Sequence, residues 1–464
     1  MSENSNTTST NVALVRGNSP AETLINGFDH LGGISKFISE GDHIFIKISF
    51  KRPFGFPENV NFDTLGKLID ICREAGAIKV YVGDFIPDHI NSETLTDITG
   101  LGNFLESRGA VFTDFNNTQL YPYKEISLND KEVQVPALLF EVHKIIILNQ
   151  VNVHPIFTCT LSYLNLLTLV PDKFQKIQKQ ERPGKDYLHL DQYKQDLISH
   201  ILDISQILEP TLVINDIFYL MEGAGPFIYK DSSCKQKNLL VMGKSPFVVD
   251  YITLQVINIE LKENQLLLEA QDHQSGLTHP ENIRVLGESI SNAKFEIQKC
   301  VSKLEDIEVK NCFVGKGRYC SGCYEKAYYL LNFLKSNMTK DLKYMGYFSF
   351  LIGEAPSKPE IGRDIILFGD CAIQSTKDRD FRNITIQKKP ISKKIIQKLK
   401  KSQKGSPKAS KKKIIKNKHI LELNGCPPDL HQCYEKLIKY YGKNIVPNLK
   451  FLELINSCFL DNQK

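Results

Sequence analysis

The chain has 464 residues, a length that accommodates two or three domains rather than one. Its contents of 42% hydrophobic and 24% charged residues are those of ordinary globular proteins, which excludes a wholly disordered chain and a fibrous repeat. The net charge of +5 is unevenly distributed, because 14 lysines and no acidic residue lie between residues 388 and 418. The rest of the chain is therefore mildly acidic, and the positive charge belongs to one segment.

The chain contains 11 cysteines, an odd number. Residues 1–11 are polar, lack the pattern of an export signal, and are predicted to form a disordered tail. Such a chain is expected in a reducing compartment, where thiols stay free or bind metal. The longest apolar stretch, residues 156–170, is shorter than the roughly 20 residues that a membrane span needs. We therefore expect a soluble, cytoplasmic protein.

Strand-like and helix-like segments alternate through the first part of the chain. Residues 43–48 have the composition of a strand, and the apolar residues of segment 65–72 recur at helical spacing. Gly76 stands where this helix would end, and residues 77–82 form a second, buried strand. This alternation predicts an α/β domain with a mostly parallel sheet over residues 12–295. Further strands are predicted at 142–148 and 211–214.

The character of the chain changes from about residue 311. Six of the 11 cysteines lie between residues 312 and 433, and the lysine-rich segment interrupts the same region. Residues 296–464 are predicted to form a second α/β domain. Within it, residues 388–418 are predicted to be a flexible, solvated insertion, because like charges repel and Ser, Gly and Pro lie at the centre of the segment.

Four cysteines of this second domain share one kind of position. Each lies where a predicted strand ends or a predicted helix begins, so the four thiols are expected at one edge of a parallel sheet. Because thiolates repel one another, a metal cation is the usual reason for such a cluster. The four are Cys320, Cys323, Cys371 and Cys426. The predicted elements beside them are helix 324–334, strand 364–368, strand 419–423 and helix 430–441.

Two kinds of metal centre suit four thiolates, a zinc ion and an iron–sulfur cluster. A single Cys-x-x-Cys step is a weak indication of either. For any one cysteine the alternative is a buried residue that behaves as a small hydrophobic group. This alternative is our interpretation of Cys72, Cys159, Cys300 and Cys458.

The segments CSGCYE at 320–325, GDCA at 369–372 and GCPP at 425–428 resemble the cluster-binding motifs of the hydrogenase small subunit and of the homologous twenty-kilodalton subunit of NADH–quinone oxidoreductase. The resemblance implies a flavodoxin-like α/β module and a [4Fe–4S] cluster. The implied ligands are Cys320, Cys323, Cys371 and Cys426. Glu325 matches an acidic position that often follows the second cysteine. The lysine-rich segment, which lies between the third and fourth implied ligands, is a departure from the pattern of the family. Because nothing in the sequence indicates a catalytic large subunit, the resemblance implies cluster binding and not hydrogenase activity.

A second resemblance covers roughly residues 12–290. The family that it indicates is named domain of unknown function 362, and its members often accompany iron–sulfur modules. The similar segments are LGG at 31–33, GDHIFIK at 41–47, AGA at 75–77, VGD at 82–84, NDI at 215–217, MEGAGP at 221–226 and SPFVVD at 245–250. The candidate site residues that the resemblance implies are Lys47, Asp84, His154, Asn165, His189, Asp216, Glu222 and Asp250.

The chain departs from this family at two lysine positions, where it has Asn152 and Leu164. If those lysines hold an anionic ligand, this chain has a weakened or altered site, and its N-terminal half can be a non-catalytic relative. Each candidate residue also has a structural interpretation. Lys47 can be the polar face of a strand, and Asp84 and Asp216, expected at the carboxyl ends of strands, can cap turns.

The lysine-rich segment has three interpretations. It can be a solvated insertion without a partner. It can contact nucleic acid, since clustered lysines release counterions from phosphates, although no aromatic residue is interleaved for stacking on bases. It can also contact an acidic partner protein or an anionic membrane surface.

Two functional hypotheses follow. The first is a redox protein in which an α/β domain is joined to a [4Fe–4S] module that transfers one electron at a time to a substrate or a redox partner protein. The second is a non-enzymatic binding protein with a structural zinc ion and a lysine-rich segment that contacts nucleic acid or an acidic partner. The GCPP and GDCA motifs favour the first. The substrate, the electron partner and the oligomeric state are not predicted.

Overall fold

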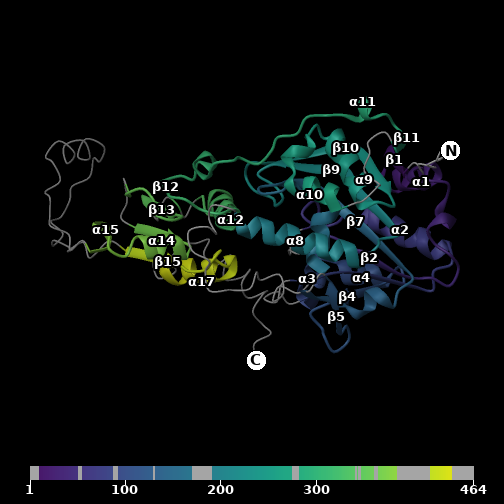
Figure 1. Cartoon of the computed structure of the whole chain (residues 1–464), viewed down its shortest axis with the longest axis horizontal. Coiled ribbons are helices and arrows are strands. Elements are labelled where there is room, and N and C mark those ends of the chain that lie inside the picture. Colours follow the sequence, from purple (N-terminus) through teal and green to yellow (C-terminus); the bar gives the residue numbers. More distant parts are fainter. Residues whose placement is uncertain are drawn as a thin grey trace, which may run out of the picture.

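The computed structural model describes residues 10–50, 55–86, 92–128, 131–169, 191–273, 282–339, 342, 346–359, 364–383 and 419–441. Within these residues the strands form a nine-stranded sheet, a four-stranded sheet and a separate two-stranded hairpin. Figure 1 shows the larger sheet at one end of the molecule and the smaller sheet at the other, with helices α8 and α12 between them.

The strands of the large sheet are β1 (Thr10–Arg16), β2 (His43–Lys47), β3 (Lys79–Asp84), β4 (Val111–Asp114), β7 (Lys144–His154), β8 (Thr158–Cys159), β9 (Leu212–Gly223), β10 (Ser232–Gly243) and β11 (Ile283–Gly287). Those of the small sheet are β12 (Cys312–Lys316), β13 (Phe348–Ile352), β14 (Asp364–Phe368) and β15 (His419–Leu423), and those of the hairpin are β5 (Tyr123–Leu128) and β6 (Lys131–Pro136). The α-helices are α1 (Pro20–His30), α2 (Phe62–Glu74), α3 (Ser92–Thr99), α4 (Leu101–Glu106), α5 (Ser162–Leu166), α8 (Gln192–Ile207), α9 (Pro246–Val256), α10 (Gln265–His273), α11 (Ile290–Ala293), α12 (Ser321–Asn337), α14 (Asp370–Ser375), α15 (Asp380–Asn383) and α17 (Leu430–Tyr441).

The large sheet is mostly parallel, as the alternation of strands and helices predicts. Its strand order is β11-β1-β10-β9-β7-β2-β3-β4, with β8 beside β7. Along this order every pair is parallel except the two that β10 makes with β1 and β9. The carboxyl ends of β2, β3, β4 and β7 therefore lie at the same edge of the sheet.

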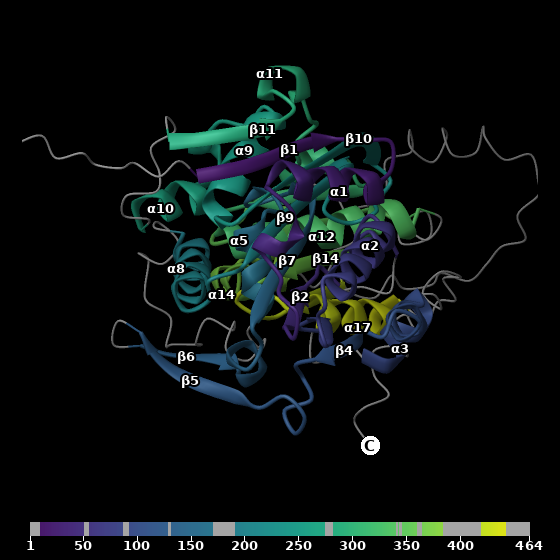
Figure 2. The same ribbon diagram turned by 90° about the vertical axis from the view of Figure 1, so that its right-hand side faces the viewer.

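Helices cover both faces of this sheet. In β2, Ile44 and Ile46 pack in one apolar core with residues of α1, α2 and α4, whereas Phe45 points to the other face and packs in a core with residues of α5, α8 and α9. Figure 2 shows α1 and α2 on one side of the sheet, α8 and α10 on the other, and the hairpin of β5 and β6 set apart from the sheet. Burial on both faces explains why the strands have nearly continuous apolar sequences.

Helix α2 shows how the local sequence determines an element. The side chain of Asn61 caps its N-terminus by accepting a hydrogen bond from the backbone N–H of Asp63. The apolar stripe of residues 65–72 is buried. Gly76 follows the helix with φ +95°, a left-handed conformation that glycine adopts without strain, and the chain then turns into β3.

The small sheet is entirely parallel, with the order β12-β13-β14-β15. Among these four strands the order follows the sequence, without the reversal that a flavodoxin-like sheet contains. Helix α12 packs on one face of this sheet, in an apolar core that also includes residues of α8 and α9. The two sheets thus share one continuous core through α8 and α12.

Three expectations concern the less regular parts of the chain. Strand β1 begins at Thr10, so the last two residues of the expected tail belong to the large sheet. The lysine-rich segment 388–418 and His189 lie outside the described residues. In the part of the chain that the structure describes, no helix combines the length and the apolar composition that crossing a bilayer requires.

Candidate functional site

The four predicted cysteine ligands lie on three neighbouring segments of the small sheet. Cys320 is the N-cap residue of α12, and Cys323 lies in the first turn of that helix rather than before it. Cys371 lies in the first turn of α14, directly after β14, and Cys426 follows β15. Because β14 and β15 are parallel neighbours, the last two cysteines lie at the same edge of the sheet.

Backbone contacts join these segments. The N–H of Gly369 donates to the carbonyl of Leu423 at 2.9 Å, and the N–H of Asp370 donates to the carbonyl of Gly425 at 3.0 Å. In return, the Asp370 carboxylate accepts a hydrogen bond from the N–H of Gly425 at 3.0 Å. These three bonds hold the loops of Cys371 and Cys426 together.

Gly369 connects these loops to α12. It has φ +84°, and a Cβ atom at this position would lie 3.2 Å from the Sγ of Cys323. A side chain would therefore crowd the thiol as well as strain the backbone. The three segments that carry the predicted ligands thus meet at Gly369.

The thiols differ in burial and interact electrostatically. Cys320 and Cys323 are each 3% exposed, Cys371 is half-buried and Cys426 is exposed. A hydrogen bond between the first two lowers the pKa of Cys320 and raises the pKa of Cys323. Burial and the charges of Cys371 and Cys426 raise the pKa of Cys323 further. The thiol of Cys323 is therefore close enough to each of the other three to be influenced by it.

Proximity is not the same as a formed metal site. Among the described residues, no group of three or more His, Cys, Asp or Glu side chains is arranged so that it could hold a metal ion. The remaining described cysteines are spread over strands, helices and one connecting segment of both parts of the chain. Burial raises the pKa of each of these thiols, least at Cys234, which is exposed: Cys72, Cys159, Cys234, Cys300, Cys312 and Cys433.

In the large sheet, Lys47, Asp84 and Asn165 form one buried cluster. The Lys47 ammonium and the Asp84 carboxylate are both 0% exposed and lie 2.7 Å apart. The ammonium also donates to Asn165 Oδ1, Thr168 Oγ1 and the carbonyl of Ile48, each at 2.8 Å. Lys47 is thus not on a solvated strand face, and its hydrogen-bonding capacity is used within the protein.

The Asp84 carboxylate also accepts hydrogen bonds from the backbone around it. Its Oδ2 accepts from the N–H of Phe50, and its Oδ1 accepts from the N–H of Phe85, both at 2.8 Å. The cluster therefore joins the carboxyl ends of β2 and β3 to the segment that contains α5. Its geometry suits a structural role more than ligand binding.

Asp216 and Asp250 are two further buried carboxylates of the large sheet. Asp216 lies within β9 and not at its end, because β9 continues to Gly223, paired with β10 on one side and, after a register shift, with β7 at Met221 on the other. It accepts from Thr64 Oγ1 at 2.6 Å and from the N–H of Phe218 at 2.7 Å. Burial raises the pKa of Asp216 from 3.8 to about 6.

Asp250 caps the N-terminus of α5 from a neighbouring helix. Its carboxylate accepts from the N–H groups of Ser162 and Tyr163 at 3.0 and 3.1 Å, and from Asn215 Nδ2 at 2.8 Å. Burial raises its pKa to about 6 as well, although these hydrogen bonds act in the opposite direction. Asp250 thus connects α5, α9 and β9.

His154 and Glu222 lie outside these clusters. Glu222, at the end of β9, accepts from the N–H of Gln298 at 3.2 Å and pairs with Lys235 at 3.7 Å. His154, at the end of β7, is buried, with Nε2 3.2 Å from the hydroxyl of Tyr329 on α12. Tyr329 in turn lies 3.3 Å from Glu325 Oε1.

This contact between His154, Tyr329 and Glu325 joins the large sheet to the helix that carries Cys320 and Cys323. Glu325 was matched to the motif and His154 was a candidate site residue, but Tyr329 and the contact that joins the three were not predicted. Glu325 and Tyr329 are four residues apart and so share one face of α12. No local sequence pattern indicates that these two residues contact His154.

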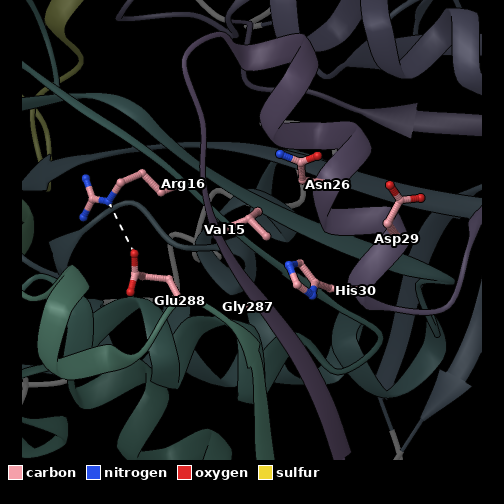
Figure 3. Close-up of a pocket in the computed structure, with 7 residues that line it drawn as sticks. All are labelled: Val15, Arg16, Asn26, Asp29, His30, Gly287 and Glu288. Atoms are coloured by element: carbon pink, nitrogen blue, oxygen red, sulfur yellow. Dashed lines mark ion pairs between the residues drawn. The ribbon is translucent and has the colours of Figure 1, made fainter.

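A surface pocket of about 450 Å³ opens elsewhere on the large sheet, between α1 and the ends of β1 and β11. Figure 3 shows that Arg16 and Glu288 pair across one side of it, while Asp29 and His30 project from α1 on the other. None of the predicted site residues lines this pocket. It contributes nothing to the candidate sites described above.

The comparisons with known proteins bear on the large sheet. Residues 44–255 match the family described as Domain of unknown function (DUF362), which confirms the predicted resemblance over these residues. The match ends before the first of the four predicted cysteine ligands. The family description assigns no chemistry.

No curated protein matches the chain. Among solved structures, the chain is similar to the lactate racemase apoprotein from Thermoanaerobacterium thermosaccharolyticum, with 13% sequence identity and a TM-score of 0.30. The alignment covers 48% of this chain and 54% of that one, so this chain spans about half of its length. A TM-score of this size supports no conclusion about shared function.

Proposed function

We propose that this chain is an iron–sulfur protein that holds one [4Fe–4S] cluster and transfers one electron at a time. The proposed ligands are Cys320, Cys323, Cys371 and Cys426. The observation that carries the proposal is that the three segments with these cysteines meet at Gly369, although Cys320 and Cys426 are 106 positions apart in the sequence.

The residues present fit such a cluster in two respects. Four thiols are the donor set that a [4Fe–4S] cluster uses. Glycine at position 369 also keeps a side chain away from a thiol, since a Cβ atom there would lie 3.2 Å from Cys323 Sγ and crowd it. Because the thiols are near one another but do not surround one point, binding requires them to close around the cluster.

When bound, the cluster would accept and release single electrons. The protein would contribute its positioning and its access to solvent. The contacts of Asp370 with Gly425 would hold two ligand loops together. Cys320 and Cys323 are buried whereas Cys426 is exposed, so the side of Cys426 offers the shortest route for an electron to a redox partner protein.

This proposal extends to the organisation of the chain. Residues 12–295 would form the domain similar to the family of unknown function, and residues 296–464 the cysteine-containing module. The protein would act in the reducing cytoplasm, where thiols remain available as ligands. The lysine-rich segment 388–418 would then be a candidate for contact with an anionic partner.

The ligand assignment is tested by substitution and metal analysis. We expect Cys320→Ser and Cys426→Ser, purified anaerobically, to lose iron and acid-labile sulfide, because a hydroxyl is a poor ligand for iron in such clusters. Cys72→Ser and Cys433→Ser serve as matched controls, since both thiols are buried and neither is among the thiols that act on Cys323, and they should retain the iron and sulfide of the unsubstituted protein.

Two results would overturn the proposal. Equal iron and sulfide contents in all four variants would remove these cysteines as ligands. Stoichiometric zinc without sulfide in the unsubstituted protein would establish the structural-zinc alternative instead.

A further inference from the structure

Two sides of helix α12 contact different parts of the protein. One side carries Cys323 towards the ligand loops, as its contact with Gly369 shows. The other side docks on the rest of the protein, where Gly322 lies against the ring of Tyr193 and a Cβ atom on this glycine would be 2.8 Å from the ring. The hydroxyl of Tyr193 also lies 3.4 Å from Glu325 Oε2. The N-terminal end of α12 is thus fixed in relation to α8.

Asp191 occupies the N-terminus of α12. Cys320 is the N-cap residue, but its side chain makes no capping hydrogen bond. The carboxylate of Asp191 takes this role instead, since its Oδ1 accepts from the N–H of Ser321 at 2.9 Å and from the Ser321 hydroxyl at 2.7 Å. A carboxylate from the segment before α8 is therefore fixed beside the residue that follows Cys320.

Such a charge has a definite effect on a neighbouring redox centre. A helix N-terminus carries a partial positive charge, which favours the addition of an electron nearby. A carboxylate at the same place opposes that effect, and it also takes up an N–H group that could otherwise donate to sulfur. Local charge and hydrogen bonds to sulfur are two of the factors that determine the potential of an iron–sulfur cluster.

We propose that Asp191 lowers the reduction potential of the cluster by placing a fixed negative charge at the N-terminus of α12. The inference rests on the proposed function, because it requires the cluster at Cys320 and Cys323. Asp191 is a positioning and tuning residue that acts through Ser321 and the helix terminus.

The test is the midpoint potential, measured by redox titration of the loaded protein with optical or paramagnetic resonance detection. Asp191→Asn removes the charge while its amide oxygen can still accept from Ser321. We expect this variant to hold the same iron and sulfide as the unsubstituted protein but to have a higher midpoint potential. Asp191→Glu keeps the charge and should keep the potential close to that of the unsubstituted protein.

A matched control is available at the other end of the same helix. Asp231 pairs with Lys335, in the last turn of α12. The helix has 17 residues. It is therefore about 25 Å long, well beyond the screening length of about 8–10 Å in physiological salt. Asp231→Asn makes the same change of charge and should leave the midpoint potential unchanged.

The outcomes separate the two proposals. If the unsubstituted protein contains no iron and sulfide, the proposed function fails, and this inference fails with it. If the loaded protein and loaded Asp191→Asn have the same potential, only the role of Asp191 is overturned. Loss of the cluster from Asp191→Asn would also overturn it, because Asp191 would then be needed to hold the cluster rather than to set its potential. A potential of Asp191→Glu as high as that of Asp191→Asn would overturn it too, because charge would not then be the determining property.

Discussion

The buried pair of Lys47 and Asp84 allows a quantitative test of the structure of the large sheet. Both side chains are 0% exposed, and the two charged atoms are 2.7 Å apart. Asp84→Ala would remove the carboxylate 2.7 Å from the ammonium and would leave the N–H groups of Phe50 and Phe85 without their carboxylate partner. Removing one member of a buried ion pair costs about 3–5 kcal/mol, because an uncompensated charge remains in the interior.

The measurement is urea-induced unfolding followed by circular dichroism. We expect Asp84→Ala to lose about 3–5 kcal/mol of unfolding free energy. Asp231→Ala is the control, since it breaks a pair in which the carboxylate is 44% exposed. Exposed pairs contribute only about 0–1 kcal/mol. The double variant Lys47→Met/Asp84→Ala should recover part of the loss, because no unpaired charge is left. A loss of less than about 1 kcal/mol in Asp84→Ala would refute this reasoning.

Two further predictions use the other buried groups. Folding raises the pKa of Asp216 from 3.8 to about 6, so the folded state takes up a proton in this window, and its unfolding free energy falls as pH rises through it. As pH rises between these values, Asp216→Asn should therefore gain about 3 kcal/mol of unfolding free energy relative to the unsubstituted protein. A difference in unfolding free energy that is independent of pH would contradict this. Gly369→Ala should lose iron and sulfide because a Cβ atom would lie 3.2 Å from Cys323 Sγ, whereas Gly41→Ala, with φ +92° and no atom within 4 Å, should lose stability alone. Equal cluster contents in the two glycine variants would contradict the crowding argument.

The elements of the fold could be predicted from local patterns. The predicted strand at 364–368 is β14, and the predicted strand at 419–423 is β15. The helix predicted at 430–441 is α17. These predictions are confirmed because periodicity and the flanking residues are local properties of the sequence. The mostly parallel character of the large sheet followed from the alternation of strands and helices.

Features that depend on distant residues were not predicted. Asp216 was expected at the end of a strand, but pairing with β10 extends β9 beyond it. Lys47 was a candidate site residue whose alternative interpretation was the polar face of a strand, and its complete burial depends on Asp84 and Asn165 from two other segments. The alternating pattern of a strand predicts which of its side chains share a face, but not which other elements cover that face.

In the candidate site, too, local features were predicted and contacts between distant residues were not. The sequence motifs identified the cysteines and their positions beside strands and helices, and the structure describes the segments that hold them. The role of Asp191 at the N-terminus of α12 and the contact of Tyr329 with His154 were missed. Each joins residues more than a hundred positions apart, and no local signal marks such a pair.

The central claim is that four cysteines hold a [4Fe–4S] cluster. The most direct test is the analysis of iron, acid-labile sulfide and zinc in the anaerobically purified protein, together with its absorbance before and after addition of dithionite. We predict a brown protein with about four iron and four sulfide per chain, bleached by dithionite. A colourless protein with stoichiometric zinc, or with neither metal nor sulfide, would contradict the claim.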